Sequence, residues 1–293
     1  MNFIEAVSFI QSFPDLDHPL FKPKTIPHMT PERMRRLLST FDNPQEGRGT
    51  VHVTGSKGKG STATYIASIL NELDGPSALF ICPHLISYTE RFKIADSQIN
   101  EEEFARALLE LKEVLLIEHE NEQLSQFQVV IALFFSILKD HSPPIKWQVL
   151  EVGMGGKHDC TNVFNKKELC VFTAIHLEHQ EFLGDTLSDI IASKAGIMTP
   201  GCPVIVAPQK HKQVVSELKA HADNLDCPFV NVEELYNCEE FSLDNDSQKV
   251  VIEGPSGRES FQTILLGKHQ IENTMTALAA IDTLFEHGQR ACQ

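Results

Sequence analysis

A glycine-rich stretch between a short apolar run and a helix constrains this chain more than any other feature. The stretch reads TVHVTGSKGKGST over residues 50–62. The alternation of Val51 and Val53 with polar neighbours predicts a strand, and apolar residues at helical spacing over 63–73 predict a helix from about Ser61. A strand, a tight turn and a helix in this order are typical of a loop that binds phosphate.

The residues of the turn have the chemistry that such a loop needs. Gly55, Gly58 and Gly60 let the backbone approach a ligand closely, so N–H groups and the helix N-terminus can converge on an anion. Lys59 adds a positive charge, and the Ser61 hydroxyl can reach a phosphate-bound Mg²⁺. The spacing departs from G-x-x-x-x-G-K-[ST], because a glycine separates the lysine from the serine. A plain glycine-rich turn therefore stays as the alternative.

Composition and charge narrow the class of protein. The chain has 293 residues, of which 42% are hydrophobic, enough for one large α/β domain or two small ones. A net charge of -15 argues against nucleic acid or an anionic membrane as the main partner. No apolar run approaches ~18 residues, the first residues lack a signal-peptide pattern, and the cysteines form no C-x-x-C pair. We expect a cytoplasmic monomer with free thiols and no membrane or nucleic-acid partner.

Strand and helix patterns alternate along the rest of the chain. Strands are predicted at 77–81, 147–152, 169–175 and 203–207, and helices at 3–13, 31–41, 101–120, 127–138, 187–197, 213–224 and 273–285. This alternation predicts an α/β fold with a mainly parallel sheet flanked by helices on both faces. Short alternating runs over 241–266 predict a small antiparallel edge near the C-terminus.

Four segments with functional side chains each follow the C-terminal end of a predicted strand. They are the glycine-rich loop, Cys82, Glu151 and Glu178-His179. Ligands of parallel sheets bind beyond this edge, so we expect the four segments to meet at one site. A strand-end acid such as Glu151 can hold Mg²⁺ directly or through water, and His179 is a candidate second ligand. Taken singly, each could also be a surface or structural residue.

Nearly the whole chain resembles the folylpolyglutamate synthase and dihydrofolate synthase family, within the Mur ligase superfamily. The matching motifs are, in order, Glu32-Arg-Met with Asn43-Pro-Gln, the phosphate loop, Cys82-Pro-His-Leu with Glu90-Arg91, Glu151-Val-Gly-Met-Gly-Gly with Asp159-Cys-Thr-Asn162, Glu178-His179 with Leu183-Gly-Asp-Thr186, Lys194-Ala-Gly-Ile197, and Gly267-Lys-His-Gln with Asn273. The family uses ATP to form an acyl phosphate on a pteroate or folate carboxylate, and the amine of glutamate then displaces phosphate. The resemblance implies a Mur ligase-type ATP-binding domain over residues 1–293, with 1–45 as a helical extension packed on it.

The resemblance also implies a role for individual residues. ATP would be bound by Ser56, Lys57, Gly58, Lys59, Gly60, Ser61 and Asn273. Mg²⁺ would be held by Ser61, Cys82, Glu151 and His179. Lys194 would be the lysine that the family carbamylates, which makes Lys59, Lys194 and His179 the catalytic group. The pterin-bearing substrate would lie against His28, Met29, Thr30, Ser125, Gln126, Phe127, Gln128, His158, Asp159 and Cys160.

Some positions depart from the family pattern. Cys82 stands where the family has a metal-binding serine, and a thiol is a poor Mg²⁺ ligand. Gln128 replaces the usual glutamate, and Glu178 replaces the usual aspartate. The family also continues into a C-terminal domain that grips ATP, whereas this chain ends after the helix that contains Asn273. We expect ATP binding with slow or no amide formation by these residues alone. A catalytically impaired nucleotide-binding protein and another Mur-type amide ligase are the alternatives.

Overall fold

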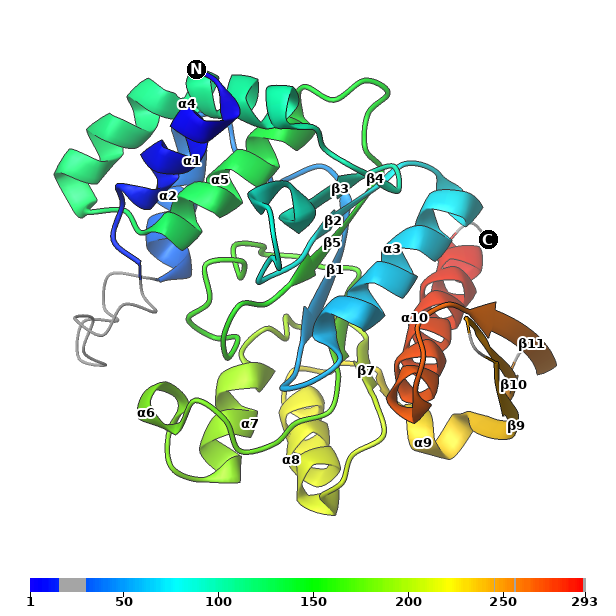
Figure 1. Cartoon of the computed structure of the whole chain (residues 1–293). Helices are drawn as coiled ribbons and strands as arrows, with labels where there is room; N and C mark the ends of the chain where they lie inside the picture. Colours follow the sequence, from blue (N-terminus) through cyan, green and yellow to red (C-terminus); the bar gives the residue numbers. More distant parts are fainter. Residues whose placement is uncertain (16–29, 245, 256, 292–293) are drawn as a thin grey trace.

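A large, mainly parallel sheet forms the centre of the computed structural model, which describes residues 1–15, 30–244, 246–255 and 257–291 (Figure 1). Its strands are β1 (Gly49–Thr54), β2 (Ser77–Phe80), β3 (Phe92–Ile94), β4 (Ser97–Gln98), β5 (Trp147–Glu151), β6 (Leu169–Phe172), β7 (Val204–Val206) and β8 (Phe229–Asn231). They lie in the order β4-β3-β2-β5-β1-β6-β7-β8. The pairs from β2 to β8 are parallel, whereas β3 and β4 add an antiparallel edge. The predicted α/β fold is confirmed.

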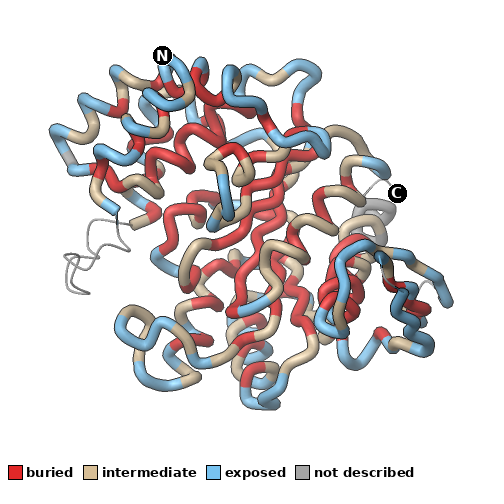
Figure 2. Tube along the Cα trace, in the orientation of Figure 1, coloured by how far each residue is buried: buried red, intermediate tan, exposed pale blue. Residues whose placement is uncertain are grey.

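Helices cover both faces of this sheet, because successive side chains of each strand point to opposite faces. On one face, Val51 and Val53 pack under α3 (Lys59–Asp74) and α10 (Lys268–Ala291). On the other face, Phe80 and Leu150 pack under α5 (Gln126–Lys139). Next to them, Phe172 lies under α7 (Leu187–Ala195) and α8 (Lys212–Asp223). The burial map shows the central strands enclosed by these layers (Figure 2).

The N-terminal helices extend the layer around α5. Helix α1 (Phe3–Gln11) contacts α4 (Glu101–Glu122) and α5, and α2 (Pro31–Ser39) contacts α5. Their buried residues Ile10 and Met34 belong to the same apolar cluster as Phe134 of α5. Both helices therefore pack against the apolar cluster around α5, and Thr30 caps α2 by accepting from the backbone N–H of Arg33.

A separate three-stranded antiparallel sheet lies beside α10 (Figure 1). Its strands are β9 (Asn237–Leu243), β10 (Gln248–Gly254) and β11 (Gly257–Thr263). The antiparallel strands expected near the C-terminus are confirmed, but they do not join the large sheet, whose own antiparallel edge is β3 and β4. Three further short helices are η2 (Tyr88–Arg91), α6 (Gln180–Leu183) and α9 (Val232–Leu235). No helix in the described part of the chain is long and apolar enough to cross a membrane.

Candidate functional site

The glycine-rich loop connects β1 to α3 and leaves the N-terminus of α3 without a side-chain cap. Gly58 occupies the N-cap position with φ of 84° and, having no side chain, makes no capping hydrogen bond to the first turn of the helix. A Cβ on Gly58 would lie 2.4 Å from the Asn273 Oδ1 atom, and one on Gly55 would lie 1.9 Å from the Thr173 Oγ1 atom. Both positions therefore require glycine. The uncapped N–H groups of this turn have the geometry that binds a phosphate.

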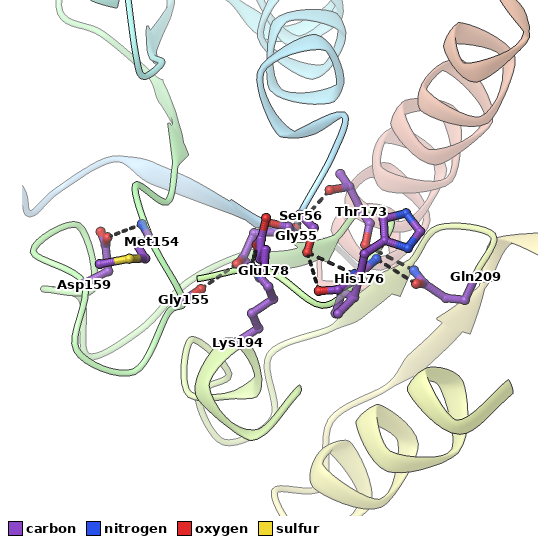
Figure 3. Close-up of polar contacts among 12 residues, drawn as sticks. Gly55, Ser56, Met154, Gly155, Asp159, Thr173, His176, Glu178, Lys194 and Gln209 are labelled. Atoms are coloured by element: carbon purple, nitrogen blue, oxygen red, sulfur yellow. Dashed lines mark hydrogen bonds and ion pairs between the residues drawn. The ribbon is translucent and has the colours of Figure 1, made fainter. Parts of the chain in front are cut away.

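Hydrogen bonds fix the loop to the chain that follows β6. The backbone N–H groups of Ser56 and Lys57 donate to the Ala174 carbonyl at 2.8 and 3.2 Å. The Ser56 hydroxyl donates to the His176 carbonyl at 3.1 Å and accepts from the His176 N–H at 3.0 Å (Figure 3). The Ser56 side chain thus anchors the loop, while the Lys57 side chain is exposed. Lys59, in the first turn of α3, is half-buried.

Helix α10 reaches the same loop from the far end of the chain. The Thr62 hydroxyl donates to Asn273 Oδ1 at 3.3 Å, and Asn273 Nδ2 donates to Gln270 Oε1 at 2.9 Å. Gln270 Nε2 in turn donates to the Ser61 hydroxyl at 3.4 Å. The structure thus places Asn273 at the loop. The structure also places Gln270 beside Ser61 and Asn273. Gln270 is part of the Gly267-Lys-His-Gln motif, but no role was predicted for it from the sequence.

Glu151, at the end of β5, lies against the first turn of α3. Its Oε2 atom accepts from the Cys82 N–H at 3.0 Å, and a Cβ on Gly60 would lie 3.1 Å from the same oxygen. The side chain is buried, and burial raises the pKa of the Glu151 carboxyl to about 7, against the opposing effects of the Cys82 N–H and the charge of Lys59. This brings the segments after β1, β2 and β5 together, as predicted.

Lys194 is buried beneath the loop rather than exposed on its helix. Its Nζ atom donates to the Gly55 carbonyl at 2.7 Å and to Glu178 Oε1 at 2.8 Å (Figure 3). Burial lowers the pKa of Lys194, which Glu178 partly offsets. Burial acts to raise the pKa of Glu178, but the adjacent Lys194 outweighs it and the pKa is lowered. The Lys194 and Glu178 pair therefore ties α7 to the glycine-rich loop and to the segment after β6.

The predicted substrate residues come together in part, at the N-terminus of α5 and the loop after β5. Ser125 and Gln128 cap the helix reciprocally and are buried. A Cβ on Gly153 would lie 2.7 Å from the Phe127 ring and 3.2 Å from Asp159 Oδ2, so these two side chains meet across that glycine. The remaining predicted positions are as follows: Gln126 donates to the Phe13 carbonyl, Cys160 is buried, His158 is exposed, and His28 and Met29 lie outside the described residues.

The other two predicted metal ligands are Cys82 and His179. Burial and the charge of Glu151 raise the pKa of the Cys82 thiol, so it stays protonated and a poor ligand for Mg²⁺. His179 is exposed and adopts a left-handed backbone with φ of 47°. In the part of the chain that the structure describes, no three His, Cys, Asp or Glu side chains form a group that could hold a metal ion. Ligation by Cys82 and His179 stays a prediction.

Known proteins resemble this chain over most of its length. The Mur ligase middle domain matches residues 53–281. A putative folylpolyglutamate synthase of Dictyostelium discoideum is 31% identical over 87% of this chain and 39% of its own length. The dihydrofolate synthase/folylpolyglutamate synthase of Bacillus subtilis is 29% identical over 86% of this chain and 59% of its own length. A solved complex of folylpolyglutamate synthase with AMPPCP and folate has 26% identity and a TM-score of 0.87, covering 99% of this chain and 68% of that one. The chain thus spans less than two thirds of these two curated relatives.

Proposed function

Since the chain belongs to the Mur ligase family, in its branch of folylpolyglutamate and dihydrofolate synthases, we propose that it is an ATP-dependent ligase. It joins L-glutamate to the carboxylate of a folate or dihydropteroate through an acyl phosphate. Residues 1–293 supply the nucleotide-binding part of the site, and the protein acts as a cytoplasmic monomer. One observation carries the proposal: the buried Glu151 carboxylate lies beside the uncapped first turn of α3, where the phosphates of ATP are expected.

The donor atoms at this turn fit a magnesium ion that is shared with nucleotide phosphates. Mg²⁺ keeps several waters and is commonly held by one or two carboxylates together with substrate phosphates. Ser61 lies in the first turn of α3 and supplies a hydroxyl. Glu151 lies against that turn and supplies a carboxylate. When bound, the ion neutralises charge on the transferring phosphate. The thiol of Cys82 does not fit such a site. The backbone N–H of Cys82, however, holds the Glu151 carboxylate in place.

The residues of the chain then have distinct tasks in the reaction. The substrate carboxylate attacks the γ-phosphorus and ADP leaves, and the glutamate amine next attacks the acyl carbon, losing a proton as phosphate leaves. Lys59 adds a positive charge near the phosphates, and the N–H groups of α3 stabilise their negative charge because the helix fixes these groups in direction before the reaction begins. Asn273 fixes the loop from the side of α10. Asp159 and Phe127 lie where the ring of the substrate is proposed to bind.

The proposed activity is tested by nucleotide consumption. ADP release is measured with dihydropteroate or tetrahydrofolate, each with and without L-glutamate. We expect slow release that depends on the pteridine substrate and on Mg²⁺, and any amide product only when glutamate is present. The two pteridines distinguish dihydrofolate synthase from folylpolyglutamate synthase activity. Tight ATP binding without any ADP release would instead support a nucleotide-binding protein that does not catalyse, which Cys82 and Gln128 favour.

The environment of Lys194 leads to a prediction about its chemistry. A buried amine with a lowered pKa is more often neutral, and a neutral amine can add CO₂, release a proton and become a carbamate. The product is an anion beside Glu178, so a nearby cation must stabilise it. With ¹³C-bicarbonate and Mg²⁺, we expect a carbamate signal by ¹³C NMR that Lys194→Met abolishes. Lys167→Met, at a second buried lysine that donates to the Ile197 carbonyl, should keep the signal. A spectrum without any carbamate signal would show that Lys194 acts only as an ion-pair partner.

A further inference from the structure

A histidine in the middle of β1 has no role in the site described above. His52 is fully buried between Val51 and Val53, whose side chains pack on the opposite face of the sheet. Its ring makes an edge contact with Phe164, at 6.3 Å between centroids. Central strands of parallel sheets usually carry apolar residues at such positions, so a buried histidine needs a reason.

The hydrogen bonds of His52 define its tautomer. The Thr161 hydroxyl donates its single hydrogen to Asp159 Oδ1 at 2.5 Å. With the Asp159 carboxyl ionised, Thr161 Oγ1 accepts from His52 Nε2, 2.9 Å away, which places the proton of the imidazole on Nε2. His52 Nδ1 is then a bare acceptor, and it is buried without a hydrogen-bond partner among the residues that the structure describes. Burial also lowers the pKa of His52 well below its ordinary value, so the ring is neutral.

The unpartnered Nδ1 costs stability. A buried acceptor that has lost water and found no partner is unfavourable, and an apolar side chain at position 52 would avoid that cost. The useful interaction of His52 is therefore the N–H that it donates to Thr161. That donation leaves the Thr161 hydroxyl only one direction for its own hydrogen, toward Asp159.

Asp159 lies at the other end of this hydrogen-bonded series. Its Oδ1 accepts from both the N–H and the hydroxyl of Thr161, at 2.9 and 2.5 Å. Its Oδ2 accepts from the Met154 N–H at 2.9 Å (Figure 3). The same oxygen lies beside Gly153, which also contacts Phe127. The orientation of this one carboxyl therefore shapes the meeting point of the loop after β5 and the N-terminus of α5.

We propose that His52 is a positioning residue that acts through Thr161 to orient the Asp159 carboxyl toward the bound substrate. The ligand at that carboxyl is a heteroaromatic ring with amino and ring N–H donors, and this part rests on the proposed function. His52 touches neither substrate nor nucleotide. Its effect is to keep Oδ1 of Asp159 occupied by Thr161 and to hold Oδ2 beside Gly153, on the side of Phe127.

Paired substitutions test this role. His52→Leu and Thr161→Val remove the N–H and the hydroxyl, whereas His52→Gln and Thr161→Ser keep a donor at each place. We expect the first pair to weaken folate binding about tenfold or more in the presence of AMPPCP, with little change in AMPPCP affinity. The second pair should bind folate nearly as the wild type does. Thr283→Val, which removes a buried hydroxyl bonded to the Ala279 carbonyl in α10, is the matched control and should leave folate binding unchanged.

Calorimetric titrations and thermal unfolding together separate positioning from structure. The unfolding temperature of His52→Leu should equal or exceed that of the wild type, because the bare Nδ1 is removed. A lower unfolding temperature with equal losses of folate and AMPPCP affinity would overturn the proposal and leave His52 a structural residue.

Nuclear magnetic resonance separates failure of this proposal from failure of the proposed function. If the wild type binds no folate, the proposed substrate is wrong. The NMR signals of His52 and Asp159 still test whether His52 positions the Asp159 carboxyl. ¹⁵N shifts should show His52 as the neutral Nε2–H tautomer, and the ¹³C signal of the Asp159 carboxyl should move in Thr161→Val and not in Thr161→Ser. An Nδ1–H tautomer, or an Asp159 signal that is the same in both Thr161 variants, would overturn the proposal.

Discussion

Glu151→Gln is expected to make the ligand-free protein more stable at pH 8 while abolishing the tightening of nucleotide binding by Mg²⁺. The pKa of this carboxyl is about 7 in the folded state, against an ordinary value of 4.5 for a glutamate side chain. The folded state therefore binds more protons between these two values, and the stability contributed by the group falls as pH rises through that window. At pH 8 the ionised Glu151 carboxyl lowers the free energy of unfolding by on the order of 3 kcal/mol. Glutamine keeps an oxygen for the Cys82 N–H and carries no charge to bury.

Thermal unfolding at two pH values checks the sign of this effect. The gain from Glu151→Gln should be large at pH 8 and small at pH 5, where the wild-type carboxyl is protonated in the folded state. Glu120→Gln, at an exposed position of α4, removes the same charge as a control and should change the unfolding temperature little at either pH. Titration of AMPPCP with and without Mg²⁺ gives the second readout. If Glu151→Gln is only as stable as the wild type at both pH values and its nucleotide binding still depends on Mg²⁺, Glu151 is not part of the site.

Lys59→Ala should weaken ATP binding by about 10- to 100-fold and leave the unfolding temperature nearly unchanged. Hydrogen bonds to charged groups are worth about 1.5–3 kcal/mol, and each 1.4 kcal/mol is about tenfold in affinity. Lys59 is half-buried at the start of α3 and no hydrogen bond from its side chain is found in the described part of the chain, so its loss should cost little stability.

A charge-matched control separates a local contact from the effect of net charge. Lys212→Ala removes one positive charge from the exposed start of α8, away from the loop, and should change ATP affinity less than twofold by a screened, long-range effect. Calorimetry at fixed Mg²⁺ and salt compares the two variants. An affinity of folded Lys59→Ala equal to that of Lys212→Ala would show that the loop does not hold the phosphates of ATP.

Local patterns in the sequence were sufficient for much of the fold. The strand and helix around the glycine-rich loop follow from side-chain periodicity and from the need for glycine at positions such as Gly58, where φ is positive. The parallel sheet follows from the alternation of strands and helices. Short elements were missed, among them β3 and β4, because two or three residues carry no periodic signal. The strand predicted to 175 ends at Phe172, and the last helix begins at Lys268, before the predicted residue 273.

The sequence by itself determined which segments carry candidate functional side chains, since a glycine-rich loop and strand-end acids are local patterns. Only the tertiary structure decided which atoms face one another. Thr62 and Asn273 meet although they lie 211 positions apart, and Lys194 turns inward to Glu178 instead of toward solvent. The bonds that orient Asp159 from His52 likewise cross from one strand to a distant loop. Such contacts depend on sheet order and on side-chain burial, which no short stretch of residues encodes.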